Sequence, residues 1–303
     1  MMGILDGKIA VVTGGTRGLG PAIAQAYARE GASVVLCGRS PEAVERAVMA
    51  INQSGQSGQS GQSGQRASGI AADVGDLADV KRLARHAIQL FGRIDIWVNN
   101  AGVAGVYGPT ASLTPSVIER GVRTNILGVY YGSLVAIQHY QAQGTSGKLI
   151  NVLGRGDRKP VPLLNAYAPT KAWVRSFTGA LAKEYAGTGI GIYLLHPGLM
   201  DTELMRSVTA VRGFEDKVKP LATVMRLWAN PPAIPAEKAV WLASSASDGK
   251  TGLEKHVFTT AHVAGGLLRD VTRRLLRRPA PTVTLDIHSV EPFTIVTGES
   301  TEV

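Results

Sequence analysis

The spacing of apolar residues along this chain alternates repeatedly between the pattern of a buried strand and that of a helix. Short runs rich in Val and Ile predict seven strands, at residues 8–13, 33–37, 68–72, 94–99, 148–153, 190–196 and 255–259. Helical patterns fill the gaps, for example at 21–30, 77–91, 115–142, 166–185 and 236–245. Continuous apolar strands are typical of a parallel sheet covered on both faces. The chain is therefore expected to be α/β, with a doubly wound parallel sheet of about seven strands and helices on both faces.

Composition narrows the class of protein further. With 303 residues, 45% hydrophobic and 18% charged, the chain has ample core and is neither disordered, collagen-like nor a coiled coil. No apolar run reaches the roughly 18 residues of a membrane helix, and the N-terminus lacks the charged region of a secretory signal. The single cysteine, Cys37, excludes an internal disulfide framework and a cysteine-based zinc site. A cytoplasmic protein without a bound metal is expected.

The net charge of +9 raises the question of a polyanionic partner. Five arginines cluster near the C-terminus, but five acidic residues in the same stretch, 264–303, bring its net charge to zero. No aromatic side chains alternate with these arginines to stack bases. No nucleic-acid partner is expected, and a solvated basic helix face accounts for the charge.

Two segments depart from the alternation. Residues 53–65 repeat Gln-Ser-Gly and are expected to form a flexible surface loop within a single domain that spans 1–260. Residues 261–303 form a C-terminal extension, predicted as an amphipathic basic helix followed by a strand at 282–287. The helix should dock against the body or a neighbouring subunit, with attachment to a membrane surface as the alternative. Its apolar face is formed by Leu267, Leu268, Val271, Leu275 and Leu276.

A glycine-rich turn, TGGTRGLG at 13–20, joins the first predicted strand to a helix that opens at Pro21. Glycines allow the backbone to approach a pyrophosphate closely, and the N-terminus of the helix offers unpaired N–H groups to that anion. The arrangement predicts a Rossmann-type dinucleotide site.

The end of the second strand discriminates between the two nicotinamide cofactors. A site for NAD(H) usually places an acid there, but this chain has Arg39 and no acid before Glu42. Arg39 and Arg17 offer two guanidinium groups to a 2′-phosphate. NADP(H) is therefore favoured over NAD(H).

Taken together, these motifs resemble the short-chain dehydrogenase/reductase family through most of residues 3–252. The resemblance rests on TGxxxGxG at 13–20, Asp73-Val74, NNAG at 99–102, YxxxK at 167–171 and Pro197-Gly198 followed by Thr202. It implies an oxidoreductase that interconverts a carbonyl and an alcohol, usually as a homodimer or homotetramer pairing through 115–142 and 166–185. The residues expected to bind the cofactor are Gly14, Thr16, Arg17, Gly18, Leu19, Gly20, Arg39, Asp73, Val74, Asn100, Ala101, Gly102, Tyr167, Lys171, Pro197, Gly198 and Thr202.

The YxxxK motif carries the expected chemistry. Lys171 follows Tyr167 by four residues and shares its helix face, so its ammonium should favour phenolate and lower the pKa of the tyrosine. Tyr167 would then act as general acid/base. In the resembling family this lysine also holds the cofactor ribose, and Asn125 matches an asparagine that organises a relay water. A structural partner for Asn125 is the alternative.

One position departs from the family pattern. The active-site serine is expected after the fifth strand, but Gly154 stands there, and no serine occurs between Ser146 and Ser176. Arg155, Asp157 or a backbone N–H of this turn could supply the missing donor in a working reductase, which is the favoured interpretation. The alternatives are a chemistry that needs less polarisation, including a non-redox rearrangement, or a nucleotide-binding sensor or scaffold without catalysis.

Residues 202–235 correspond to the mobile lid over the substrate in the resembling family. Their apolar side chains would suit a bulky apolar ketone or alcohol, or would instead pack the lid onto the core. These side chains are Leu204, Met205, Val208, Val211, Phe214, Val218, Leu221, Met225, Leu227 and Trp228.

Overall fold

The computed structural model describes residues 3–55, 66–276 and 279–295. A seven-stranded parallel sheet forms its centre, in the order β3-β2-β1-β4-β6-β7-β9. Each predicted strand overlaps one strand of this sheet, so the predicted doubly wound fold is confirmed. The strands are β1 (Ile9–Val12), β2 (Ser33–Gly38), β3 (Ala67–Ala71), β4 (Ile96–Asn99), β6 (Lys148–Val152), β7 (Gly191–His196) and β9 (Glu254–His256).

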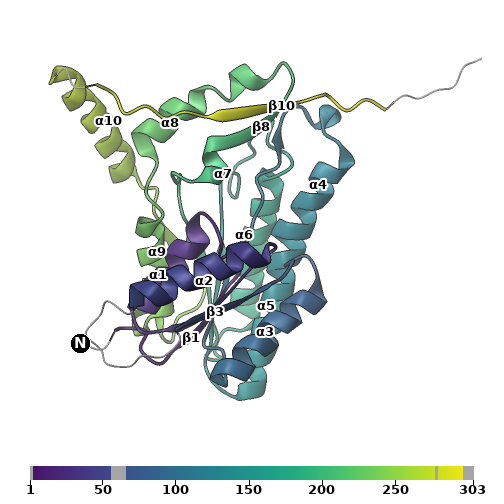
Figure 1. Ribbon diagram of the computed structural model, residues 1–303, viewed down its shortest axis with the longest axis vertical. Helices are drawn as coiled ribbons and strands as arrows, with labels where there is room; N and C mark the ends of the chain where they lie inside the picture. The colour runs from purple at the N-terminus through teal and green to yellow at the C-terminus, as the bar shows by residue number, and fades with distance from the viewer. Residues whose placement is uncertain (1–2, 56–65, 277–278, 296–303) are drawn as a thin grey trace, which may run out of the picture.

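Helices cover both faces of the central sheet (Figure 1). The first core cluster joins one face to α1 (Leu19–Arg29), α2 (Pro41–Gly55) and α9 (Ala233–Ala243). The second joins the other face to α3 (Leu77–Phe91), α5 (Gly128–Gln143) and α6 (Ala168–Glu184). Alternate residues of β2 divide between the clusters, with Val34 and Leu36 in the first and Val35 and Cys37 in the second. A sheet buried in this way on both faces produces the continuous apolar runs of the sequence.

The helix predicted at 115–142 is interrupted. Its first part is α4 (Pro115–Gly121), and a π-helical segment (Val122–Leu127) connects α4 to α5. A π-helical turn accommodates an extra residue that apolar periodicity over a long window does not resolve. Asn125 lies in this segment, fully buried.

A second, three-stranded parallel sheet has the order β10-β8-β5. Its strands are β5 (Val106–Tyr107), β8 (Ser207–Val211) and β10 (Asp286–Val290). Figure 1 shows β10 crossing the upper part of the molecule beside β8. The strand predicted at 282–287 overlaps β10 only at its last two residues, because pairing with β8 sets the bounds of the strand.

The C-terminal helix α10 (Thr260–Leu275) packs against α8 (Pro220–Trp228) through polar contacts. Arg226 forms an ion pair with Asp270 at 2.6 Å, and the Trp228 Nε1–H donates to the Val263 carbonyl at 3.1 Å. The apolar face of α10 is exposed, so the expected docking of this face on the body of the same chain is wrong. Docking on another subunit or a membrane surface stays a prediction. The relative exposures are Leu267 49%, Leu268 67%, Val271 53%, Leu275 79% and Leu276 58%.

Two further expectations concern the Gln-Ser-Gly repeat and membrane-spanning helices, and the structure covers each of them only for the residues that it describes. The first residues of the Gln-Ser-Gly repeat end α2, and 56–65 lie outside the described residues. None of the helices in the described ranges combines the length and apolar character that crossing a bilayer requires.

Candidate active site

The glycine-rich turn forms a close-packed cradle at the carboxyl end of β1. Gly14 has a φ of +64°, and a Cβ atom there would lie 2.8 Å from the Cα of Ala101. A Cβ atom at Gly20 would lie 2.0 Å from the Gly14 carbonyl oxygen. Only glycine fits at these positions, which brings the backbone and the start of α1 to the edge of the sheet where ligands of this fold bind.

The start of α1 suits an anionic group. Its N-cap residue, Gly18, makes no side-chain cap, and the first turn contains no acidic residue. The N–H groups of Thr16, Arg17 and Leu19 donate none of the hydrogen bonds found among the described residues. Thr202 is buried, and its Cγ2 is 3.8 Å from the position of a Cβ at Gly18, so the segment after β7 lies against the turn. The residues present therefore fit the pyrophosphate of a dinucleotide.

Asn100, directly after β4, holds the glycine turn in place. Asn100 Nδ2 donates to the carbonyls of Thr13 and Gly14 at 3.0 and 3.1 Å. Asp73 Oδ1 accepts from the Gly75 N–H at 2.9 Å, and Val74 is buried. The carboxyl ends of the adjacent strands β1 and β4 thus meet at this site, whereas Asp73 and Val74 lie in the turn that follows β3.

Arg17 and Arg39 lie at the ends of two adjacent elements, in the glycine turn and directly after β2. Both side chains are exposed, and neither has an ion-pair partner in the part of the chain that the structure describes. Both guanidinium groups are therefore available to a ligand at this edge.

Tyr167 and Lys171 start α6 and face the cradle. Lys171 Nζ lies 5.7 Å from the centroid of the Tyr167 ring and donates to the Val152 carbonyl at 3.0 Å. A Cβ at Gly102 would lie 3.8 Å from Lys171 Nζ and 3.4 Å from Asn125 Oδ1. The structure therefore brings the predicted catalytic residues together beside the end of β4.

Asn125 has protein partners for its side chain. Its Oδ1 accepts from the Val103 N–H at 2.9 Å, and its Nδ2 donates to the Val103 carbonyl and to Thr170 Oγ1, both at 3.0 Å. These bonds tie the π-helical segment to the loop after β4 and to α6. The structural partners considered as an alternative are therefore present.

Gly154 leaves the space that the tyrosine hydroxyl takes. A Cβ atom at Gly154 would lie 2.0 Å from the hydroxyl oxygen of Tyr167 and 3.4 Å from Lys171 Cγ. Any residue with a side chain at 154 would therefore displace the end of Tyr167. The observed position of the Tyr167 hydroxyl therefore requires a glycine at 154, and a serine there would not fit.

The protonation equilibria of the pair differ from the sequence expectation. Burial raises the pKa of Tyr167 well above its ordinary value, and the Asp157 carboxylate raises it further. Burial lowers the pKa of Lys171 to about 8, with Asp157 opposing the change. The expectation of a lowered tyrosine pKa is wrong, because the sequence motif does not reveal that the half-buried phenol is shielded from water by its neighbours.

The three candidates for replacing the serine hydroxyl lie in different surroundings. Arg155 is exposed, whereas Asp157 is buried and its carboxylate accepts two hydrogen bonds from Arg175. The N–H groups of Gly154, Arg155 and Gly156 donate no hydrogen bond to another described residue. The backbone of this turn therefore has free donors beside the tyrosine.

Arg175 is a residue that motif reasoning missed. It follows Lys171 by four residues on α6 and contacts Asp157 and Glu254. Helical spacing from the YxxxK motif was the available signal. Its acidic partners lie on other elements, and only the fold brings them close.

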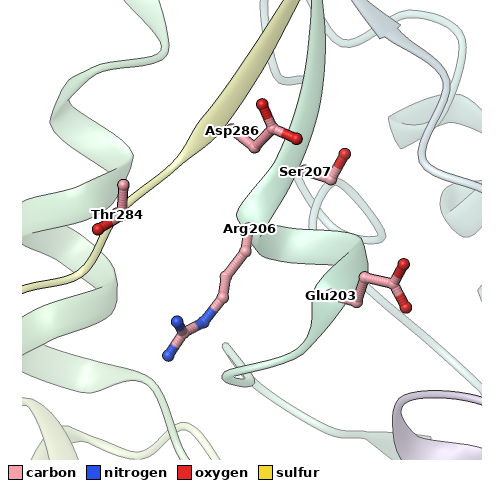
Figure 2. A pocket seen from close by; sticks show the side chains of 5 residues that line it. All are labelled: Glu203, Arg206, Ser207, Thr284 and Asp286. Carbon is pink, nitrogen blue, oxygen red and sulfur yellow. The ribbon is translucent and has the colours of Figure 1, made fainter.

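Residues 202–235, which are expected to form a lid, pack partly onto the core. Val211, Val218 and Met225 are buried, whereas Leu204 is exposed. An open pocket of about 490 Å³ lies between α7 (Glu203–Arg206) and the segment that leads into β10. Figure 2 shows Glu203 and Arg206 leaving α7 in different directions, with Thr284 and Asp286 on the facing segment. The C-terminal extension thus forms one wall of this pocket, and polar side chains line much of it.

A family profile described as short chain dehydrogenase matches residues 8–213. The chain belongs to the short-chain dehydrogenase family. This family member is 34% identical over 267 residues to 3beta-hydroxysteroid dehydrogenase 1 of Eggerthella lenta, covering 87% of this chain and 94% of that protein. It is 28% identical over 265 residues to glucose 1-dehydrogenase 2 of Bacillus subtilis, covering 87% and 95%.

A solved structure supports the same assignment. It is that of a 3-ketoacyl-(acyl-carrier-protein) reductase from Brucella melitensis, complexed with NADH. The two folds superpose with a TM-score of 0.71 at 30% identity, covering 84% of this chain and 97% of that chain. The resemblance inferred from the motifs is confirmed, and these relatives are named as oxidoreductases.

Proposed function

We propose that this dehydrogenase interconverts a carbonyl compound and an alcohol with NADP(H), and that Tyr167 is its general acid/base. The observation that carries the proposal is the position of the Tyr167 hydroxyl, over Gly154 and beside Lys171, at the edge of the sheet that holds the glycine cradle. The nicotinamide ring, when bound, supplies or accepts a hydride at its C4 atom.

Because its pKa is raised, Tyr167 is a neutral phenol at neutral pH, the form that takes part in carbonyl reduction as a proton donor. A neutral phenol can donate its proton to the oxygen of a carbonyl as charge develops there. Lys171, with a pKa of about 8, is largely protonated at pH 7 and can stabilise the phenolate that remains. The same ammonium can hold the cofactor ribose, and Asn125 keeps the neighbouring loop in place.

The backbone of the turn after β6 takes over the role of the missing serine. The free N–H groups of Gly154, Arg155 and Gly156 can donate to the substrate oxygen, as backbone donors do in other oxyanion sites. A single donor of this kind contributes about a hundred- to a thousandfold in rate in other enzymes. The absence of the serine is thus compatible with catalysis.

Selectivity for NADP(H) rests on Arg17 and Arg39. Their exposed, unpaired guanidinium groups flank the place where a 2′-phosphate would lie, and no acid occupies the position after β2. Two charge-assisted contacts to a phosphate favour NADP(H) over NAD(H).

We also propose a cytoplasmic homo-oligomer that pairs through α5 and α6. Aromatic side chains gather across these helices. The Tyr130 ring lies 6.2 Å from the Phe177 ring, and Trp173 stacks on Phe177 at 4.6 Å. Tyr130 is 40% exposed, which leaves an apolar surface that a second copy can cover.

The test is NADPH oxidation against a panel of ketones and quinones, with the wild type and Tyr167→Phe in parallel. We expect the wild type to turn over at least one compound and the variant to lose a hundred- to ten-thousandfold in kcat, with NADPH fluorescence still reporting binding. Tyr131→Phe on α5 is the matched control and should keep full activity. Equal turnover by wild type and Tyr167→Phe would contradict the proposal. If NADPH binds tightly but none of the tested compounds is turned over, the result would favour a non-redox enzyme or a nucleotide-binding sensor.

A further inference from the structure

Arg175 continues the catalytic face of α6. It lies four residues after Lys171 and eight after Tyr167, so the three side chains leave the helix on one side. Only 22% of its side chain is exposed. A cation this well covered, one turn from the proposed catalytic pair, requires partners that compensate for its desolvation.

Two carboxylates from separate elements supply those partners. Arg175 Nε and Nη2 both donate to Asp157 Oδ2, at 3.0 and 2.5 Å. Its Nη1 donates to Glu254 Oε2 at 2.9 Å, and Nη2 also contacts Glu254 Oε1. Asp157 belongs to the turn after β6, and Glu254 starts β9. One guanidinium thus links α6 to the active-site turn and to the edge of the sheet.

Other charged groups surround this bridge. His196, at the end of β7, places Nε2 3.7 Å from Asp157 Oδ1, and its Nδ1 accepts from the Gly198 N–H at 3.2 Å. His256, on β9, places Nε2 2.5 Å from Glu254 Oε1, and the rings of the two histidines stack at 5.3 Å. Arg158 donates to Glu254 Oε2 at 2.9 Å.

Asp157 also belongs to the turn that carries the free backbone donors. Its N–H donates to the Gly154 carbonyl at 3.3 Å, which closes the turn directly beneath the Tyr167 hydroxyl. Because Arg175 fixes the Asp157 side chain, it also fixes the main chain of the turn that contacts the Tyr167 hydroxyl.

We propose that Arg175 and Asp157 form a positioning pair, in which the arginine fixes the turn at Gly154 and offsets the negative charge that Asp157 presents to Tyr167 and Lys171. The inference rests on the proposed function for its catalytic consequence, but the charge balance itself can be measured without a substrate. Neither residue touches the reacting atoms; both act through the tyrosine and the lysine.

The two members of the pair change the local charge in opposite directions. Asp157 raises the pKa of both Tyr167 and Lys171. Asp157→Asn removes that charge, so the pKa of Lys171 falls below its wild-type value. Arg175→Met leaves the carboxylate without its partner, so the pKa of Lys171 rises. A role confined to packing would not move the two variants in opposite directions.

The experiment measures the pKa of Lys171 from the chemical shift of its Cε atom across pH 6 to 10, by NMR of the protein with ¹³C-labelled lysine, because Lys171 is buried and closed to chemical reagents. Lys171→Met assigns the resonance. We expect the titration midpoint to fall by about half a pH unit or more in Asp157→Asn and to rise by a similar amount in Arg175→Met. Arg158→Met is the matched control, because Arg158 contacts Glu254 and not Asp157, and its midpoint should equal that of the wild type.

Shifts of the same sign in both variants, or no shift in either, would overturn the inference. Circular dichroism establishes that each variant is folded. If Arg175→Met does not fold, Arg175→Lys, which keeps the charge but loses the two-carboxylate geometry, takes its place. It should retain the wild-type midpoint yet lower kcat more than it raises KM. The titration midpoint of Lys171 is measured without turnover, so a substrate panel that gives no turnover would count against the proposed function alone.

Discussion

The hydroxyl oxygen of Tyr167 lies 2.0 Å from the position that a Cβ atom would take at Gly154. The glycine therefore leaves room for the end of the tyrosine side chain beside the turn after β6. The same turn presents backbone N–H groups without protein partners.

Arg39 is expected to determine the choice of cofactor. Arg39→Asp replaces a cation by an anion at the place proposed for the 2′-phosphate, which costs a charge-assisted hydrogen bond of about 1.5–3 kcal/mol and adds repulsion. The Kd of NADPH should rise about tenfold or more, with that of NADH nearly unchanged, as measured by fluorescence titration. Arg29→Asp, at the exposed far end of α1, is the control. An unchanged ratio of the two affinities would refute the assignment of Arg39.

Lys171 is expected to make the stability of the protein depend on pH. Burial lowers its pKa from 10.5 to about 8 in the folded chain, so the unfolded chain binds more protons between these values. The free energy of unfolding therefore rises with pH across that window. Relative to Lys171→Met, the wild type should gain up to about 3 kcal/mol between pH 8 and 10.5 in urea unfolding.

Lys183→Met, at an exposed position of the same helix, is the control for this titration and should show no such gain. If the free energies of unfolding of the wild type and Lys171→Met differ by the same amount at every pH in this range, the pKa of Lys171 is not lowered in the folded chain.

The pairing of β10 with β8 is expected to protect the lid. Ile287 lies opposite Val208 in this parallel ladder, and the Arg212 N–H donates to the Val290 carbonyl at 2.8 Å. Ile287→Pro removes one N–H from β10 and should speed hydrogen exchange at Ser207–Val211 about tenfold or more. Thr284→Pro, before the strand, should leave that exchange unchanged. Equal rates in both variants would mean that the strand does not hold the lid.

The central sheet could be predicted because its strands are buried on both faces. The run of residues in β2 does not alternate between apolar and polar side chains, and a helical pattern follows it. This combination is typical of a parallel sheet covered by helices on both faces. The small second sheet could not be predicted, because β5 has only two residues and β8 lies within a segment whose apolar residues suit a lid. Short strands acquire their bounds from their partners.

The candidate site was predictable as a set of positions, and its electrostatics were not. The motif spacing places Tyr167 and Lys171 on one helix face, as the structure does. Whether the phenol is buried depends on the turn at Gly154, and the Asp157–Arg175 ion pair joins residues 18 positions apart on different elements. Such pairings follow from the position of the turn after β6 beside α6, which local periodicity does not encode.

The Tyr167 hydroxyl occupies the space left by Gly154, and we propose that it works there without a serine. The most direct test measures kcat/KM for NADPH-dependent reduction by Gly154→Ser, with Gly154→Ala beside it. Because the clash involves the end of one side chain, both variants should fold, and displacement of the hydroxyl by about 1 Å should lower kcat/KM by about a hundredfold. A Gly154→Ser enzyme faster than the wild type would contradict the claim and show that the serine is simply missing.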